Sequence, residues 1–301
     1  MQPLKGKVAV VAGATRGAGR GIACMLGATG ATVYCTGRST RQNRSELNRP
    51  ETIEETAEFV TQYGGVGHWA QVDHTVPMQV AALFDRVQAE QGRVDILVNN
   101  MSGDQFLTNG MLSGKEPIPF WEYPIEKGLA TQQNGVHTHL ITSFYAAKMM
   151  TKRGQGLIVE VNDGNSLQFN DVGLYYSLSK ASLVLLANYL AEELKEHNVT
   201  ALSLTPGWLR SESMLEGFGV TEANWQDAVA RAPDFIHSET PFYIGRAVVA
   251  LAADPNVMAK SGHALSAGGL AREYGFTDID GRQPPAYYAE GIFKDGYFMK
   301  A

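Results

Sequence analysis

The sequence has few cysteines, no excess of basic residues and no long hydrophobic run. Its 301 residues include two cysteines, Cys24 and Cys35, which cannot form a disulfide framework in a chain of this length, and we interpret both as reduced core residues. Lys and Arg total 25 against 31 Asp and Glu, giving a net charge of -6, which disfavours nucleic acid. Apolar runs such as Val8–Val11 are far shorter than the roughly 20 residues needed to cross a membrane. We therefore expect a cytoplasmic protein that binds neither nucleic acid nor a membrane.

Motifs of metal and serine hydrolase chemistry are also missing. No HExxH or CxxC occurs, and His137 and His139, two residues apart, would point to nearly opposite faces of a helix. The nearest approach to a Gly-x-Ser-x-Gly motif, at residues 164–168, lacks the last glycine. We expect neither a metal site nor a serine hydrolase.

What the sequence does contain is an alternation of short apolar runs with longer helical patterns. This alternation predicts β-α-β units and an α/β fold with a parallel sheet covered by helices on both faces. We expect seven strands, at Lys7–Ala12, Ala31–Thr36, Gly67–Val72, Asp95–Asn99, Leu157–Val161, Thr200–Thr205 and His263–Ser266. We expect helices at Arg20–Thr29, Thr52–Tyr63, Pro77–Gln91, Thr131–Arg153, Tyr175–Glu196 and Pro241–Ala253.

Three segments depart from this rhythm. Residues Arg38–Pro50 are polar and include four arginines. The segment at about 211–240, after the sixth strand, mixes large apolar and acidic residues and is expected to cover a site as a lid. From about residue 270 to 301 we expect a C-terminal tail, irregular from Thr277, packed on the body or on a partner subunit.

A glycine-rich turn follows the first strand. Gly13, Gly17 and Gly19 form a G-x-x-x-G-x-G pattern directly before a helix, where free backbone N–H groups attract a pyrophosphate. This predicts a dinucleotide site. The second strand ends without the acid that would bind an adenosine ribose, whereas Arg16 and Arg38 suit a 2′-phosphate. We therefore expect NADPH/NADP rather than NADH, the alternative being that Arg38 is a solvated loop residue.

A tyrosine and a lysine follow the fifth strand at positions i and i+4. Tyr176 and Lys180 thus share one helix face, and a cation beside a phenol favours the phenolate, which eases proton exchange near neutral pH. Asn99-Asn100 ends the fourth strand and Pro206-Gly207 follows the sixth. With these motifs in this order, the sequence resembles the short-chain dehydrogenase/reductase family from about Gly6 to Gly269.

The resemblance implies one domain, residues 1–301, with a Rossmann-type doubly wound parallel seven-stranded sheet in three α/β/α layers. It implies hydride transfer between the nicotinamide and a small-molecule substrate, and a homodimer or homotetramer built on the two long helices. The runs Leu270–Gly275 and Asp278–Gly281 further resemble one branch of the family, with human and bacterial members.

The resemblance also assigns roles to individual residues. Tyr176 would donate a proton to the carbonyl oxygen, and Lys180 would hold the nicotinamide ribose. The cofactor would be held by Gly13, Thr15, Arg16, Gly17, Gly19, Arg38, Asp73 at the adenine, Asn99 near a ribose, Tyr176, Lys180, Pro206, Gly207 and Ser211 at the carboxamide. Substrate would be lined or covered by Trp208, Met214, Phe218 and Trp225.

One position departs from the family pattern. The family places a Ser thirteen residues before the Tyr, and this chain has Asp163 there, whereas Ser166 is too close to the Tyr to replace it. An ionised carboxylate about 4 Å from a developing oxyanion would oppose it by roughly 4 kcal/mol at an effective dielectric of about 20. That energy corresponds to about a thousandfold in rate. Asp163 would then be protonated, or act ionised on an iminium or amine, or face away and tie a loop.

Two further polar residues are candidates. Asn134 is the only Asn in the long helix before the fifth strand, where the family has an active-site Asn, although counting back from Met149–Met150 gives Gly135. Glu160 lies within the fifth strand and is expected to be a buried acid in a structural pair. The sequence predicts a NADPH-dependent reductase of a fairly apolar carbonyl compound. The alternatives are an imine or C=C reductase and a catalytically weak NADPH-binding sensor or assembly subunit.

Overall fold

The computed structural model describes residues 2–44, 48–103, 118–163 and 172–286, and the backbone of the strand pairs 293–294 and 297–298. At its centre is a seven-stranded sheet with the strand order β3-β2-β1-β4-β5-β6-β7, in which all six neighbouring pairs are parallel. The strands are β1 (Val8–Ala12), β2 (Thr32–Gly37), β3 (Val66–Gln71), β4 (Ile96–Asn99), β5 (Gly156–Val161), β6 (Val199–Thr205) and β7 (Ala264–Ser266), with a separate antiparallel pair, β8 (Phe293–Lys294) and β9 (Tyr297–Phe298). The expected strands are thus confirmed to within one residue at each end.

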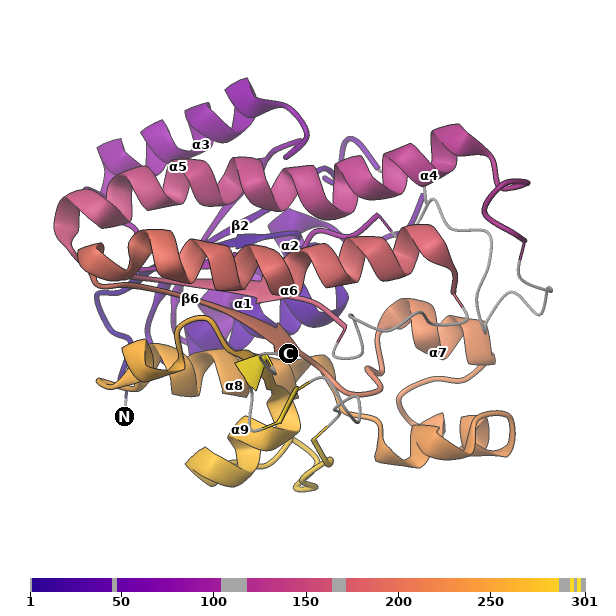
Figure 1. The fold of residues 1–301 in the computed structure, drawn as a ribbon. Helices are drawn as coiled ribbons and strands as arrows, with labels where there is room; N and C mark the ends of the chain where they lie inside the picture. The colour runs from indigo at the N-terminus through magenta and orange to yellow at the C-terminus, as the bar shows by residue number, and fades with distance from the viewer. Residues whose placement is uncertain are drawn as a thin grey trace.

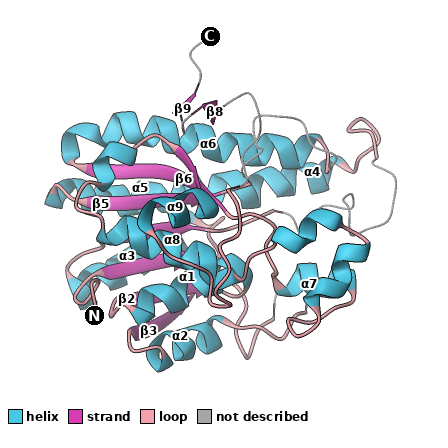
Figure 2. Ribbon diagram, turned by 90° about the horizontal axis from the view of Figure 1, so that it is seen from below, coloured by secondary structure: helices cyan, strands magenta, loops and turns pink. Residues whose placement is uncertain are grey.

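Helices cover both faces of the sheet, which confirms the three-layer arrangement (Figures 1 and 2). Their bounds are α1 (Gly17–Ala28), α2 (Ile53–Gln62), α3 (Pro77–Gln91), α4 (Ile125–Gln132), α5 (Thr138–Arg153), α6 (Leu174–Leu194), α7 (Glu212–Phe218), α8 (Pro241–Ala253) and α9 (Ala267–Tyr274). The helix expected over Thr131–Arg153 starts earlier, and a π-helical turn at Gln133–His137 joins α4 to α5.

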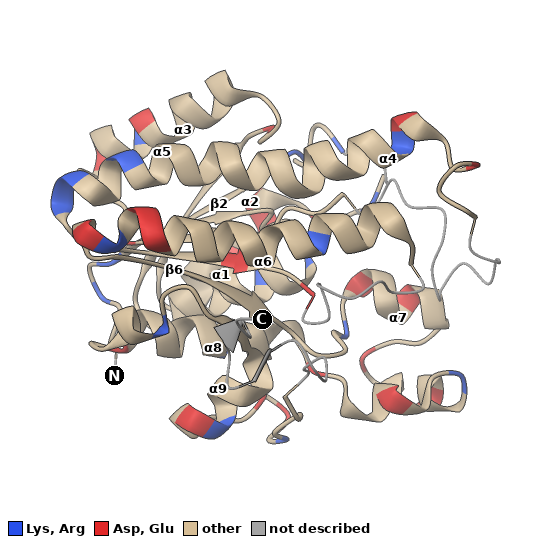
Figure 3. Ribbon diagram, viewed as in Figure 1, with Lys and Arg blue, Asp and Glu red and all other residues tan. Residues whose placement is uncertain are grey.

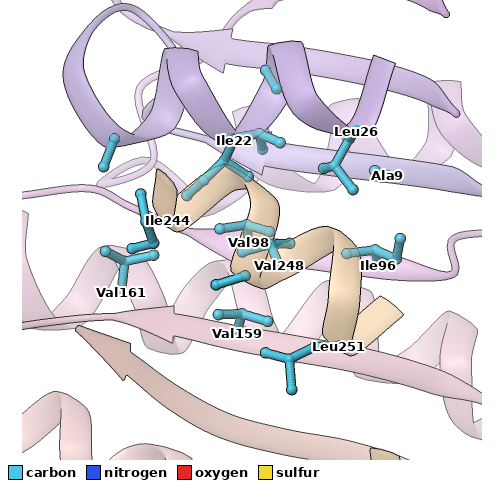
Figure 4. Close-up of a cluster of buried hydrophobic side chains, with 14 of the residues drawn as sticks. Ala9, Ile22, Leu26, Ile96, Val98, Val159, Val161, Ile244, Val248 and Leu251 are labelled. Carbon is cyan, nitrogen blue, oxygen red and sulfur yellow. The ribbon is translucent and has the colours of Figure 1, made fainter. Parts of the chain in front are cut away.

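The strands alternate between two cores, as the two-residue period of a strand requires. In β1, Ala9 and Val11 face the core under α1, α2 and α8, whereas Val8 and Val10 face the core under α3, α5 and α6. Figure 4 shows the first core, where Ile22 and Leu26 of α1 and Ile244, Val248 and Leu251 of α8 pack on Ala9, Ile96, Val98, Val159 and Val161 of the sheet. The cysteines are free and buried, and burial raises the pKa of Cys24 to about 11, so the expected reduced core pair is confirmed.

The lid segment carries a small core of its own. After α7 come two 3-10 helices, at Trp225–Ala230 and Pro233–His237, and their buried residues Phe218, Trp225 and Phe235 pack together. The C-terminal segment differs in part from expectation. Residues 270–274 form the end of helix α9, whereas a tail is expected from about residue 270. The Ser266 side chain caps this helix by accepting from Gly269 N–H. Beyond it, the Tyr243 hydroxyl donates to the Pro284 carbonyl, so the described part of the tail packs on the body.

A polar cluster lies within the core where β4 and β5 end. Glu160 of β5 is fully buried, and its Oε1 accepts from Asn99 Nδ2 and Ser143 Oγ, each at 2.9 Å. Its Oε2 lies 2.5 Å from Nδ1 of the equally buried His139. The other ring nitrogen of His139 lies 2.9 Å from the Met101 carbonyl, which can only accept, so that nitrogen carries a proton. Glu160 and His139 therefore share one further proton, and the expected structural pairing of Glu160 is confirmed.

The hydrogen bonds of Glu160 predict different stabilities for two variants. Glu160→Gln keeps an acceptor for Asn99 and Ser143 and can donate to His139, so we expect the free energy of unfolding to change by less than about 1 kcal/mol. Glu160→Ala strands three buried partners, so we expect a loss of about 3–5 kcal/mol. Urea unfolding curves measure both, with exposed Glu193→Ala of α6 as the control. Equal large losses in Gln and Ala would contradict the shared-proton arrangement.

Candidate active site

The glycine-rich turn is fixed to both neighbouring strands. Gly13 and Ala14 N–H donate to the Thr36 carbonyl at the end of β2, at 3.0 and 2.9 Å. Asn100, just after β4, donates from Nδ2 to the Gly13 carbonyl at 3.1 Å. Gly13 has a φ of +81°, and a Cβ on Gly19 would lie 2.1 Å from the Gly13 oxygen, so the first turn of α1 fits against the loop only as glycine. The loop lies where strand order reverses between β1 and β4, the usual ligand crevice of such sheets.

An anion from this chain already occupies the start of α1. Gly17 N–H donates to Oε2 of Glu212 at 2.8 Å, although α1 has no acidic residue in its own first turn. Glu212 opens α7, and Figure 3 shows acidic residues along this helix. A helix N-terminus favours negative charge, and here its N–H group binds a carboxylate. The phosphates of a dinucleotide therefore fit the donor chemistry of this loop.

Arginines gather beside the loop. Arg16 is partly buried, and burial lowers its pKa, while the carboxylates of Glu51 and Glu212 oppose that shift. Arg49 pairs with Glu51 at 3.2 Å and also with Glu216 of α7. Arg38 directly follows β2 and is partly buried. Because this edge carries cationic groups beside the glycine loop, it is suited to a phosphate as well as to a neutral ribose.

Two expected cofactor residues have local roles in the structure. Asp73, after β3, accepts from the N–H and hydroxyl of Thr75 at 2.9 and 2.6 Å, a turn that precedes α3. Asn99 is fully buried, and its amide donates into the Glu160 cluster. Because no surface of Asn99 is exposed, the structure does not support a direct ribose contact and gives this residue a supporting position beneath the site.

At the end of β5, the tyrosine and the aspartate meet. The Tyr176 hydroxyl on α6 donates to Oδ2 of Asp163 at 2.5 Å, and the Lys180 ammonium lies 5.1 Å from the centre of the Tyr176 ring. Lys180 is buried and Tyr176 and Asp163 are partly exposed, so a polar group can reach the hydroxyl. Because Asp163 contacts Tyr176, the alternative in which Asp163 faces away and only ties a loop is wrong. Ser166 lies outside the described residues.

The Asn134 side chain forms a hydrogen bond within its own helix. Its amide donates to the Ala130 carbonyl at 2.9 Å. The π-helical turn instead turns Gly135 toward α6, where a Cβ would lie 2.5 Å from the Ser179 hydroxyl oxygen. The position obtained by counting back from Met149–Met150 is therefore the residue that faces α6, and a role for Asn134 in the reaction stays a prediction.

The lid residues divide into two groups. Phe218 and Trp225 are buried in the lid's own core, so the structure does not support their facing a substrate. Trp208 and Met214 are partly buried against that core. Ser211 caps α7 by accepting from Met214 N–H at 3.3 Å. At the other end of the lid, Oε2 of the buried Glu239 accepts from Gly207 N–H at 3.0 Å.

Three residues of this site were given no role by sequence reasoning. Asn100 had a signal, because the paired asparagines end a buried strand. Glu212 and Glu239 had none, because their partners, Gly17 and Gly207, are distant in sequence and are bound through backbone N–H groups.

In the described ranges no cluster of three His, Cys, Asp or Glu side chains could hold a metal ion. No helix there is long and apolar enough to span a membrane.

Comparison with known proteins agrees with this geometry. The family model described as short chain dehydrogenase matches residues 7–217. The chain is 39% identical over 295 residues to mouse "Dehydrogenase/reductase SDR family member 1", covering 96% of this chain and 88% of that protein. The human protein of the same name is 37% identical over 289 residues, covering 95% and 87%. A crystal structure of a short chain dehydrogenase from Mycobacterium thermoresistibile aligns with a TM-score of 0.75 at 22% identity, covering 97% and 96%.

The structural likeness concerns the fold, whereas the family model and the two mammalian relatives concern the sequence itself. These relatives confirm the branch that Leu270–Gly275 and Asp278–Gly281 indicate. Proteins of this family are oxidoreductases that use a nicotinamide cofactor. The chain therefore belongs to the short-chain dehydrogenase family.

Proposed function

We propose that this protein is a NADPH-dependent oxidoreductase that reduces the carbonyl group of a small, fairly apolar substrate. The observation that carries the proposal is the contact of Tyr176 with Asp163, beside Lys180, at the same sheet edge as an anion-binding glycine loop. The proposed proton donor and the glycine loop thus lie at the same edge of the sheet, as hydride transfer requires.

In this proposal Tyr176 is the general acid. A nicotinamide cofactor held at the glycine loop would supply the hydride, and the site residues would then meet negative charge developing on the substrate oxygen. Tyr176 donates its hydroxyl proton to that oxygen, and the Lys180 ammonium beside the ring stabilises the phenolate that remains. Lys180 is held for this role because it is buried on the same face of α6 as Tyr176.

Asp163 acts as a neutral carboxylic acid in this reaction. Without substrate the Tyr176 hydroxyl donates to Asp163. With substrate bound, that one proton would turn to the substrate oxygen, and the O–H of a protonated Asp163 would donate a second hydrogen bond to the same oxygen, which replaces the Ser hydroxyl of the family. An ionised carboxylate would instead oppose the developing oxyanion. The same short contact favours a second candidate reaction, the reduction of an iminium, because an ionised Asp163 beside Tyr176 would stabilise a cationic substrate.

The preference for NADPH is supported by the arginines and by the end of β2. That strand ends at Gly37 and is followed by Arg38, with Arg16 in the glycine loop. A 2′-phosphate dianion would be attracted by both guanidinium groups, and no carboxylate follows β2 to repel it. Of the residues expected to hold the cofactor, we retain Gly13, Thr15, Gly17, Gly19, Asp73, Pro206, Gly207 and Ser211.

A homodimer or homotetramer is part of the proposal. The outer sides of α5 and α6 expose large apolar residues, among them Leu140 and Phe144 on α5 and Leu178 and Tyr189 on α6. The two helices lie side by side in Figure 1 and contact each other. Exposed apolar residues gathered on neighbouring helices favour association with a second copy.

Tyr176→Phe tests the proposed chemistry. The ring remains beside Lys180 but has no proton to donate, so we expect turnover of ketones to fall by at least about 100-fold. The NADPH dissociation constant should stay within about twofold, since the cofactor phosphates do not depend on the hydroxyl. NADPH absorbance gives the rate and fluorescence titration gives the affinity. The control is Tyr175→Phe, and a Tyr176→Phe variant that retains native turnover would overturn the role of Tyr176.

Arg38→Ala tests the cofactor preference. Loss of a charge-assisted contact with the 2′-phosphate should weaken NADPH binding by about 10- to 100-fold and change NADH binding by less than about threefold. Arg44→Ala, in the same polar segment, is the matched control. Equal affinity of the native protein for NADPH and NADH would sink the preference.

A further inference from the structure

Glu239 joins the end of the lid to the turn after β6. Its N–H donates to the Trp208 carbonyl at 2.7 Å, and its carbonyl accepts from Arg210 N–H at 2.8 Å. Its side chain reaches back to Gly207, where Oε2 accepts the N–H at 3.0 Å. The residue is fully buried, and Oε1 has no hydrogen-bond partner among the described residues. A buried carboxyl group with one unused oxygen is unusual enough to require an explanation.

The neighbouring cation does not neutralise Glu239, because its donors are used elsewhere. Arg210 directs Nε to Glu222 at 2.9 Å, Nη1 to the Ser238 carbonyl at 2.9 Å and Nη2 to Asp280 at 3.0 Å. Its guanidinium also lies 4.5 Å from the centre of the Trp225 ring. Arg210 therefore binds the lid and the C-terminal segment together and leaves Glu239 without an ion pair.

Burial and one nearby carboxylate oppose the negative charge of Glu239. Asp278 of the C-terminal segment supplies that carboxylate, whereas the Tyr243 hydroxyl of α8 donates to the Pro284 carbonyl. Burial, with the Asp278 charge adding to it, raises the pKa of Glu239 to about 8, against the lowering effects of Gly207 N–H and Arg210. Glu239 is therefore a neutral acid at pH 7. Since Oε2 accepts from Gly207, the proton belongs on Oε1.

This acid costs stability in a defined pH range. Below pH 4.5, the ordinary value of the group, it is neutral in the folded and unfolded chains alike. Between there and about pH 8 the unfolded chain loses this proton and the folded chain keeps it, so stability declines as pH rises. A glutamine would keep the bond to Gly207 without this loss. Glu239 thus lowers stability where a glutamine of the same shape would not, and this makes Glu239 a candidate for a functional role.

The turn that Glu239 holds lies beside the proposed proton donor. β5 and β6 are neighbours, with Val161 opposite Leu204, and Asn162 N–H donates to the Leu204 carbonyl at 3.0 Å. Asp163 and Gly207 thus leave adjacent strands at the same sheet edge. Hydride transfer requires the nicotinamide to lie next to the group that Tyr176 protonates, which brings it to this part of the edge.

We propose that Glu239, as a neutral acid, is a positioning residue that holds the Pro206–Gly207 turn against the nicotinamide end of the cofactor. This rests on the proposed function. When Glu239 ionises, it keeps the bond to Gly207 N–H, but its buried negative charge repels the anionic cofactor, so cofactor affinity falls. Glu239 then couples cofactor binding to pH through the lid rather than through a group in the crevice.

The first test is the pH dependence of NADPH affinity. For the native protein the neutral fraction of Glu239 falls about tenfold between pH 7 and pH 9, so the NADPH dissociation constant should rise about tenfold over that range. In Glu239→Gln the rise should be absent. Glu239→Ala, which removes the acceptor for Gly207, should bind NADPH more weakly than Glu239→Gln at every pH. Glu222→Gln is the control, because Glu222 pairs with Arg210 and does not contact Gly207. Its NADPH dissociation constant should depend on pH as that of the native protein does.

The second test is thermal unfolding of the native protein and Glu239→Gln, which needs no cofactor. The melting temperature of the variant should exceed the native one by about 5 °C at pH 8, with the gap closing toward pH 5. A purely structural role would give this gap with parallel NADPH profiles, and that result would overturn the positioning proposal. A gap of zero at every pH would overturn the neutral acid. A native protein that binds no NADPH at pH 7 would instead refute the proposed function.

Discussion

The buried hydrogen-bonded cluster around Glu160 and His139 joins the elements that carry the two halves of the site at the carboxyl edge of the sheet. Through Asn99 and Ser143 the pair joins β4 to β5 and α5, and through the Met101 carbonyl it holds the start of the segment after β4. Each half of the site begins one to three residues from this cluster. Asn100 follows Asn99 and fastens the glycine loop, whereas Asp163 lies three residues beyond Glu160 and meets Tyr176. A neutral, fully bonded pair can serve this purpose in a core where a lone charge could not.

The lid is part of the site rather than a free flap over it. Glu212 at its start binds the N–H of Gly17 in the cofactor loop, and Glu239 at its end binds the N–H of Gly207. Both bonds pair a lid carboxyl group with a backbone N–H at the carboxyl edge. Arg210 adds a third connection by joining the lid to the C-terminal segment through Asp280. The lid carboxyl groups are therefore tied to the glycine loop and to the turn after β6.

The strands could be predicted from the sequence because each is an apolar run that both cores require, such as Val8–Ala12. Asp163 could be placed near Tyr176 because the family resemblance puts a site residue thirteen positions before the Tyr, and the structure has the two side chains in contact. Asn134 was chosen as the only Asn in the predicted helix, whereas counting back gives Gly135, which the π-helical turn places against α6; the role of Asn134 stays a prediction.

Other features depend on tertiary contacts that leave no local pattern. Phe218 and Trp225 are of the residue types that line apolar substrate pockets, but in the structure they are buried in the core of the lid itself. Asn99 stands at a strand end like a ligand residue, yet its burial assigns it to the Glu160 cluster. Glu239 is one acid among many in the sequence, and only burial without a counter-charge sets it apart.

The central claim is that a neutral Asp163 beside Tyr176 serves carbonyl reduction, and NADPH oxidation by the native protein and by Asp163→Ser tests it most directly. Ketones, aldehydes, quinones, enones and cyclic imines would be compared under identical conditions. The account predicts that the native protein reduces ketones and that Asp163→Ser is equally or more active, because a hydroxyl supplies the same hydrogen bond. Turnover restricted to imines or enones, or activity lost in Asp163→Ser, would contradict it and assign the carboxylate a chemical role of its own.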